Sequence, residues 1–269
     1  AASDVYKRQG TDKVLLDTVM QPEVLEQQMQ QINDIYFKVF DELYDIIREG
    51  DEMAFCYFSS WAPGKMSKLQ SDISTMISED DYRRFVQPFI REQCQKIDYT
   101  LYHLDGVGAM HHLPALLEIE ELDAIQWTPG VGEPQGGSPK WYDLYKKILA
   151  GGKSIMACWV TLDELKPLLD NIGADGVHLE MDFHNEQEVE QAMRIVEEYS
   201  SSSPAASKES LSKEEATATK QETIIIKSPE AAEDEALKPL FNAIVDGKLE
   251  PAVEAVSYTH LRAHETDSY

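Results

Sequence analysis

The sequence predicts an α/β fold, in which short buried strands alternate with amphipathic helices to form a parallel sheet or part of a (β/α) barrel. Five short apolar runs begin near residues 53, 99, 123, 154 and 175. The segments between them carry apolar residues at every third or fourth position, the period of a helix with one buried face. Five units in about 190 residues fall short of the eight units that close a barrel. We therefore expect an open one.

The first unit begins with a long helix. Residues 22–48 have apolar side chains spaced by three and four positions, and Gly50 is the expected C-cap. Residues 53–60, MAFCYFSS, are predicted to form a buried strand. A second helix is expected over residues 78–97, because Ser78 is a good N-cap and the acids after it suit the helix dipole.

The later units repeat this alternation. Strands are predicted at residues 99–103, 122–128, 154–160 and 174–181, and helices at residues 107–119, 138–152, 161–173 and 185–200. Thr161 is the expected cap of its helix. Within the last strand, His178 and Glu180 alternate with two apolar residues, so we expect both polar side chains on one face, at the barrel mouth.

Charge and cysteine content limit the possible partners. The chain has 49 acidic and 24 basic residues, a net charge of -25. This balance argues against binding a phosphate backbone, which needs clustered Lys and Arg. The cysteines, Cys56, Cys94 and Cys158, are far apart and predict no disulfide framework. No apolar run approaches the roughly 18 residues that span a bilayer. We therefore expect a cytoplasmic protein with no nucleic-acid or membrane partner.

The character of the chain changes after residue 200. Residues 201–234 are rich in Ser, Ala, Lys and Glu, the composition of a disordered linker, and residues 235–256 return to a helical pattern. Residues 1–9 and 257–269 share no periodicity with their neighbours, and both resemble translated sequencing-adapter DNA. We therefore expect the chain to be a metagenomic fragment of a longer protein, with spurious residues at both ends.

Residues 10–200 resemble the C-terminal part of the uroporphyrinogen decarboxylase (URO-D) superfamily. Three stretches carry the resemblance: LQSDISTMISEDDYRRFVQPFIREQ, YHLDGVGAMHHLPALLEIEELDAIQW and GADGVHLEM. Members of this family are TIM (β/α)8 barrels. The resemblance therefore implies a partial TIM barrel, in which the five predicted strands are the fourth to eighth.

Two activities occur in this superfamily. One branch decarboxylates uroporphyrinogen in porphyrin biosynthesis without a cofactor; the other moves methyl groups to or from a corrinoid protein. Residues 235–256 resemble the start of the helical cap that covers cobalamin in corrinoid proteins. The resemblance thus implies a methyltransferase acting on a small methylated substrate, with cobalamin held by a corrinoid protein or domain. The alternatives are a decarboxylase and an inactive barrel scaffold for a corrinoid carrier.

The resemblance also implies site residues at the strand ends, where barrel enzymes place their catalytic groups. His103 matches a family histidine, whereas Asp105 replaces a cysteine that helps to hold zinc in the thiol-methylating branch. The last strand offers His178 and Glu180 in place of a second cysteine. The resemblance therefore implies a zinc site of His103, His178 and Glu180, with harder nitrogen and oxygen ligands. The alternatives are that His103 binds substrate or only bonds a neighbouring strand, and that Asp105 caps a helix.

Further candidates complete the site. Asp72 matches a family position near the substrate, so His103, Asp105 and Asp72 are the expected catalytic residues. Trp127 ends its strand and is either a substrate contact or a packing residue. Cys158 is expected in the core, and His111 and His112 on a helix surface.

Overall fold

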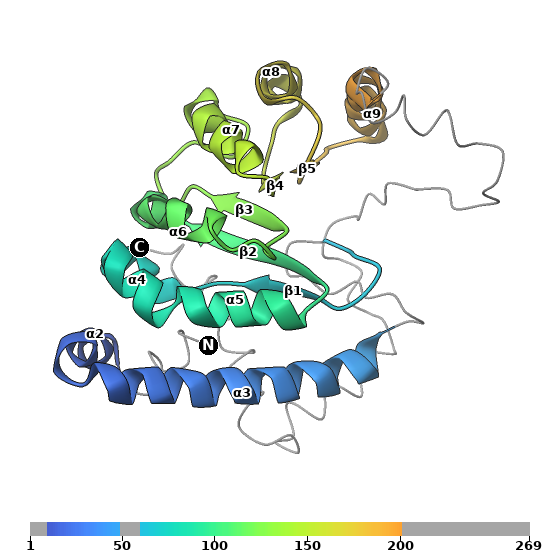
Figure 1. Cartoon of the computed structure of the whole chain (residues 1–269). Coiled ribbons are helices and arrows are strands. Elements are labelled where there is room, and N and C mark those ends of the chain that lie inside the picture. The colour runs from blue at the N-terminus through green and yellow to red at the C-terminus, as the bar shows by residue number, and fades with distance from the viewer. Residues whose placement is uncertain (1–9, 49–59, 201–269) are drawn as a thin grey trace. The chain divides into compact units, whose positions relative to one another are not determined.

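A computed structural model describes residues 10–48 and 60–200, and the fold in these ranges is α/β (Figure 1). Several predictions fall outside the described residues: the C-cap Gly50, the linker at 201–234, the helical cap at 235–256 and the two spurious ends. The strand expected at 53–60 also lies outside them, apart from Ser60. In the described part of the chain, no helix is long and apolar enough to cross a membrane.

The five strands form one parallel sheet whose spatial order follows the chain, β1-β2-β3-β4-β5. The strands are β1 (Met66–Leu69), β2 (Tyr99–Asp105), β3 (Ala124–Thr128), β4 (Ser154–Ala157) and β5 (Val177–Leu179). The register places His103 of β2 opposite Gln126 of β3, and Met156 of β4 opposite His178 of β5. Parallel strands end at the same edge of a sheet, so this order brings five strand ends into one row.

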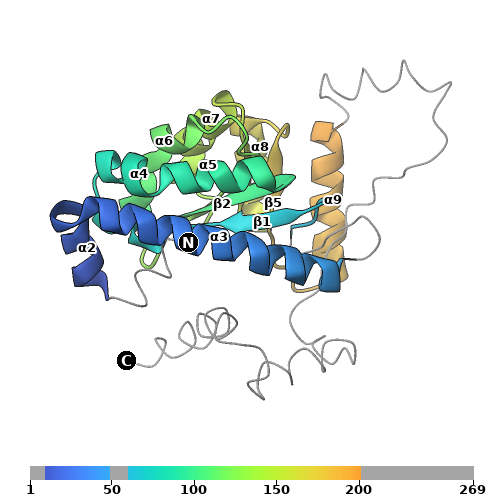
Figure 2. The same ribbon diagram turned by 60° about the horizontal axis from the view of Figure 1, so that its bottom comes forward.

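Helices connect the strands and precede the first of them. They are α2 (Thr11–Met20), α3 (Pro22–Ile47), α4 (Glu79–Phe85), α5 (Gln87–Lys96), α6 (Leu113–Leu117), α7 (Tyr142–Ala150), α8 (Leu162–Ile172) and α9 (Glu186–Ser200), with short 3-10 turns η1 (Asp72–Met76), η2 (Val107–His112) and η3 (Pro139–Trp141). The long helix α3 packs against α4 and α5, and the turned view shows it alongside β1 (Figure 2).

The two faces of the sheet differ in what covers them. Tyr102, Leu104, Ile125 and Trp127 point into a large core that helices α2 to α8 complete. The other face carries a smaller apolar cluster without helical residues. Its members are Ala62, Met66, Leu101, Met156 and Cys158. The helices therefore lie as an arc on one side of the sheet, and the second face is free of them in the described ranges (Figure 1).

Most predicted elements are confirmed, with three corrections. Strand β1 lies at Met66–Leu69, a segment not predicted as a strand, because MSKL is short and has Lys68 at its centre. Helix α2 was also not expected. The helix predicted over 78–97 is two helices, since Pro88 lies at the start of α5 and a proline interrupts a helix by removing an N–H donor.

The helix starts follow the sequence signals. The Ser78 side chain accepts a hydrogen bond of 3.1 Å from the backbone N–H of Asp81, which confirms it as an N-cap. Thr161 forms a capping box with Glu164, whose carboxylate accepts from the backbone N–H of Thr161 at 3.1 Å. These caps fix where α4 and α8 begin, and so where the preceding loops leave the sheet.

Candidate functional site

Polar side chains gather where the strands end, on the face of the sheet that carries no helix within residues 10–48 and 60–200. Alternation along β2 puts Leu104 in the core and His103 and Asp105 on the other face. Alternation along β3 likewise puts Trp127 in the core and Gln126 and Thr128 opposite. In parallel α/β proteins, ligands bind at this carboxyl edge of the strands. This edge is therefore the candidate site.

A hydrogen-bonded chain crosses the site from β2 to β4. The amide nitrogen of Gln126 donates to the Thr128 hydroxyl at 2.8 Å and to the Cys158 sulfur at 3.1 Å. Its amide oxygen is thereby left facing the Nδ1 atom of His103, with which it is hydrogen-bonded. A carbonyl oxygen can only accept, so Nδ1 carries the proton and donates it to Gln126. The Nε2 atom of His103 is thus the one turned to the site.

Asp105 lies on the other side of the same ring. Its Oδ2 atom is 3.7 Å from Nε2 of His103. Hydrogen bonding with His103 lowers the pKa of the Asp105 carboxyl, partial burial opposes this effect, and the charges of His103 and Lys68 add to it. The His103 ring therefore lies between the amide oxygen of Gln126 and the carboxylate of Asp105. All three side chains are on the uncovered face of the sheet.

The Asp105 pKa gives a direct test of this contact. We expect the carboxyl to titrate below its ordinary value of about 3.8 in the folded chain, and to return toward it in the His103→Ala variant. A lowered pKa contributes stability that is present above the ordinary pKa and is lost as pH falls through the lowered one. NMR titration of the Asp105 carboxyl carbon measures the shift. An unchanged pKa in His103→Ala would contradict the contact.

Asp72 reaches the same edge from the neighbouring strand. The amide nitrogen of Gln70 donates to Oδ1 of Asp72 at 3.0 Å, and Lys68 donates to the amide oxygen of Gln70. Because Gln70 directly follows β1, this chain holds Asp72 at the end of that strand, at the start of η1. Asp72 therefore lies one strand away from His103, on an exposed turn.

The expected zinc ligands are distributed along the site. His178 and Glu180 lie opposite the apolar face of β5, as predicted, because Val177 and Leu179 pack against the helix-side core. They are three strands from His103. Among the described residues, no three His, Cys, Asp or Glu side chains group closely enough to hold a metal ion. The donor set His103, His178 and Glu180 is therefore not assembled, and we assign zinc no step in the chemistry.

His178 and Glu180 influence each other electrostatically at the end of β5. The His178 ring is exposed, yet the protein around it removes part of its hydration and lowers its pKa, while the charge of Glu180 partly offsets this. The Oε2 atom of Glu180 is buried and has no hydrogen-bond partner in the described part of the chain. A buried carboxylate oxygen without a donor is costly, so this atom is a notable feature of the site.

The structure places two of the residues considered above, Trp127 and His112, in the core. Trp127 is fully buried on the helix side of the sheet, where its ring meets Trp141 edge-on at 5.0 Å between centroids. It therefore packs in the core and faces away from His103. His112 was expected on a helix surface but is 1% exposed, stacked on Tyr82, with Nε2 2.6 Å from the Ser74 carbonyl oxygen. Burial accordingly lowers the pKa of His112.

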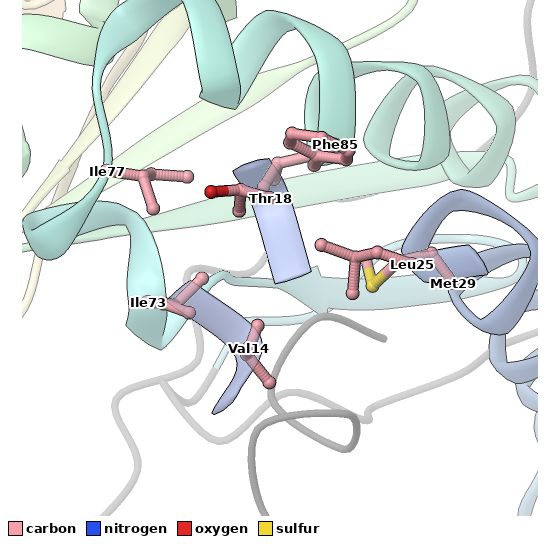
Figure 3. A pocket seen from close by; sticks show the side chains of 8 residues that line it. Val14, Thr18, Leu25, Met29, Ile73, Ile77 and Phe85 are labelled. Atoms are coloured by element: carbon pink, nitrogen blue, oxygen red, sulfur yellow. The ribbon is translucent and has the colours of Figure 1, made fainter. Parts of the chain in front are cut away.

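A small cavity lies on the helix side of the molecule, away from the site (Figure 3). Its volume is about 20 Å³, little more than one water molecule occupies. It is lined by α2, α3, η1 and α4 and by Ile77 and Val86 beside them. All but one of the lining residues are apolar: Val14, Thr18, Leu25, Met29, Ile73, Ile77, Phe85 and Val86. We interpret it as a packing gap between helices rather than a ligand site.

The structure adds residues that the sequence analysis did not select. Gln126 and Thr128 carry the hydrogen-bonded chain, and Cys158, expected only in the core, is buried but accepts from Gln126. Trp159 follows it and is 39% exposed at the site's edge. The alternation of polar and apolar residues in AIQWT was a signal that could have identified Gln126 and Thr128.

Comparisons of the chain with protein-family models, with curated proteins and with solved structures give no match. The structural class of the protein therefore follows from its fold and its site alone. The chain is an α/β protein with a parallel sheet, helices on one face, and ionisable side chains at the carboxyl edge of the other face.

Proposed function

We propose that this chain forms strands four to eight of a TIM barrel in a corrinoid-dependent methyltransferase of the URO-D superfamily. It would move a methyl group between a small methylated substrate and a cobalamin protein. The resemblance of residues 10–200 to that superfamily leaves two reactions, and the resemblance of residues 235–256 to a corrinoid-protein cap favours methyl transfer. The polar edge around His103 is where the reaction would occur.

The barrel assignment is supported by the order of the strands. In a doubly wound sheet the order reverses at a switch point, and helices cover both faces. In a (β/α) barrel each strand lies beside the previous one, and all helices lie outside. The sequential order β1 to β5, with helices on one face, fits the barrel pattern. The uncovered face would then be the barrel interior.

The observation that carries the functional proposal is the fixed orientation of His103. Gln126 holds Nδ1, and Asp105 lies 3.7 Å from Nε2, where it can stabilise a positive ring. Histidine gains and loses a proton near neutral pH. In its protonated form, His103 can therefore donate a hydrogen bond from Nε2 to a departing oxygen, which stabilises the negative charge that builds up there and lowers the barrier to breaking the bond to methyl.

Cobalamin, when bound by its partner, supplies the nucleophile or the leaving group for the methyl. The predicted corrinoid cap at residues 235–256 lies outside the described residues. The described residues would orient the substrate. Asp72 and Asp105 are exposed at the ends of adjacent strands, so they can contact different groups of one small molecule.

Methyl transfer to cob(I)alamin tests the proposal. We expect the 269-residue chain, with five of the eight barrel units, to be inactive alone, so the test uses the longer protein to which we propose it belongs. This protein is incubated with cob(I)alamin and a panel of methyl ethers and methylated amines, and transfer is followed by visible absorption spectroscopy. We expect transfer from at least one donor. Turnover of uroporphyrinogen without cobalamin would replace the proposal with the decarboxylase. Absence of both reactions, with cobalamin protein retained on the chain, would replace it with the scaffold.

A further inference from the structure

The end of strand β4 contains a β-bulge. In a regular parallel ladder, successive hydrogen bonds advance by two residues on both strands. The N–H of Ile155 donates to the carbonyl of Gly176 at 2.8 Å, so the carbonyl of Glu180 should accept from residue 159. It accepts from Val160 instead, at 3.1 Å. One extra residue therefore stands opposite Glu180, and Cys158 and Trp159 share that place.

The bulge changes where the Trp159 side chain lies. Without it, alternation would turn residue 159 into the helix-side core, where Ile155 and Ala157 point. Val160 takes that core position and is 1% exposed, whereas Trp159 is left 39% exposed. Bulges of this kind redirect side chains and occur next to active sites.

The bulge requires a strained backbone conformation at Trp159. Its φ is +56°, in the left-handed region that bulky residues rarely adopt. Among the described residues it is the one non-glycine residue with positive φ. Gly136 supports the bulge from the β3–α7 loop: its N–H donates to the Cys158 carbonyl at 3.1 Å, and a Cβ at position 136 would lie 2.4 Å from that oxygen. Such conformations persist where the surroundings fix them, often at ligand sites.

Glu180 stands opposite the bulge and carries the buried Oε2 atom that lacks a donor among the described residues. An aromatic face and a carboxylate are together the groups that recognise an organic cation: the ring attracts the positive methyl groups, and the carboxylate accepts an N–H. The net charge of -25 also favours the approach of cations.

We propose that Trp159 and Glu180 form a binding site for an N-methylated ammonium group that retains one N–H, carried by a small molecule. Trp159 covers the methyl groups, and Oε2 of Glu180 accepts the N–H. The inference rests on the proposed function in one respect: the ammonium group would anchor the small methylated substrate at β4 and β5, two and three strands away from His103, which acts on the departing atom.

Three probes of similar size separate the parts of this recognition. Trimethylammonium has the charge, the methyl groups and the N–H; tetramethylammonium lacks the N–H; tert-butanol has methyl groups and a donor but no charge. We expect calorimetry on the full chain to rank trimethylammonium first, with tert-butanol weaker by about tenfold or more, the factor that about 1.4 kcal/mol represents. Equal binding of trimethylammonium and tert-butanol would overturn the proposal.

Variants locate the site. Trp159→Ala and Glu180→Gln should each weaken trimethylammonium binding about tenfold, whereas Trp159→Phe keeps an aromatic face and should lose less. Trp61→Ala is the matched control, because Trp61 is also an exposed tryptophan, at 49%. It should leave binding unchanged. Thermal unfolding of each variant is recorded, and full binding by a folded Trp159→Ala variant would refute the site.

The two proposals fail in different ways. Ammonium binding that depends on Trp159, without methyl transfer to cob(I)alamin, would support this site and refute the methyltransferase. Transfer from methyl ethers, without binding of trimethylammonium, would support the methyltransferase and refute this site.

Discussion

Replacement of Trp127 by alanine is expected to lower the free energy of unfolding by about 3–5 kcal/mol, the usual cost of removing a buried large aromatic side chain. Trp127 is fully buried between the sheet and the helices, and its ring contacts Trp141 edge-on. Alanine would leave a cavity that neither β3 nor the helix layer can fill without moving. Chemical denaturation followed by circular dichroism measures the loss.

Trp127→Phe is the matched control for this prediction. The Nε1 atom of Trp127 is buried without a hydrogen-bond partner among the described residues, so phenylalanine removes an unsatisfied donor while keeping an aromatic ring. Its cost should be below about 1.5 kcal/mol. If Trp127→Ala instead left stability unchanged and weakened ligand binding, Trp127 would be a substrate contact, the alternative that the sequence left open.

His103→Ala is expected to reduce the rate of methyl transfer to cob(I)alamin by about 10²–10⁴, the range for loss of a proton-transferring group. The loss should fall on kcat more than on KM, because Nε2 acts on the departing atom. Loss of the ring also leaves the buried amide oxygen of Gln126 without its hydrogen-bond partner, so thermal unfolding of the variant is recorded beside the rate. Stopped-flow spectroscopy of cob(I)alamin consumption measures the rate.

His111→Ala is the control for that experiment. His111 is an exposed histidine on η2, eight positions after His103, with Nε2 3.1 Å from the Ile77 carbonyl oxygen. Its removal should leave the rate within about twofold, the effect of a surface change away from the site. Gln126→Leu should mimic part of the His103 loss and shift the pH profile, because the ring loses its fixed tautomer. Unchanged rates in both His103→Ala and Gln126→Leu would contradict the assigned role.

Much of the fold was predictable because periodicity reports burial. Helices with strong amphipathic spacing, such as Pro22–Ile47, and the predicted strands that fall wholly within the described residues were found at their predicted places. Strand β1 was missed because only four of its residues pair and one of them, Lys68, is charged, which is more typical of a loop. The Lys68 side chain lies on the uncovered face, where a lysine can reach solvent. The break before α5 was missed because the apolar spacing continues across Pro88. The proline interrupts the helix through its missing N–H donor, which periodicity does not report.

The site was less predictable than the fold. Alternation told which residues share a face, and this correctly grouped His178 with Glu180, but it could not tell which face of β3 the helices cover. Trp127 was therefore weighed as a substrate contact when it packs in the core. The bulge at Trp159 was not visible in SIMACWV, because a left-handed residue depends on contacts from Gly136 and Glu180, far along the chain.

The sequential order of the strands also bears on how the chain folds as it is made. Each strand after β1 pairs with the strand synthesised just before it, so no strand must wait for a distant segment to emerge from the ribosome. Contacts between neighbouring units close short loops, which form faster than long-range pairings. The sheet can thus grow by one strand and one helix at a time, from the N-terminal side, in the direction of translation.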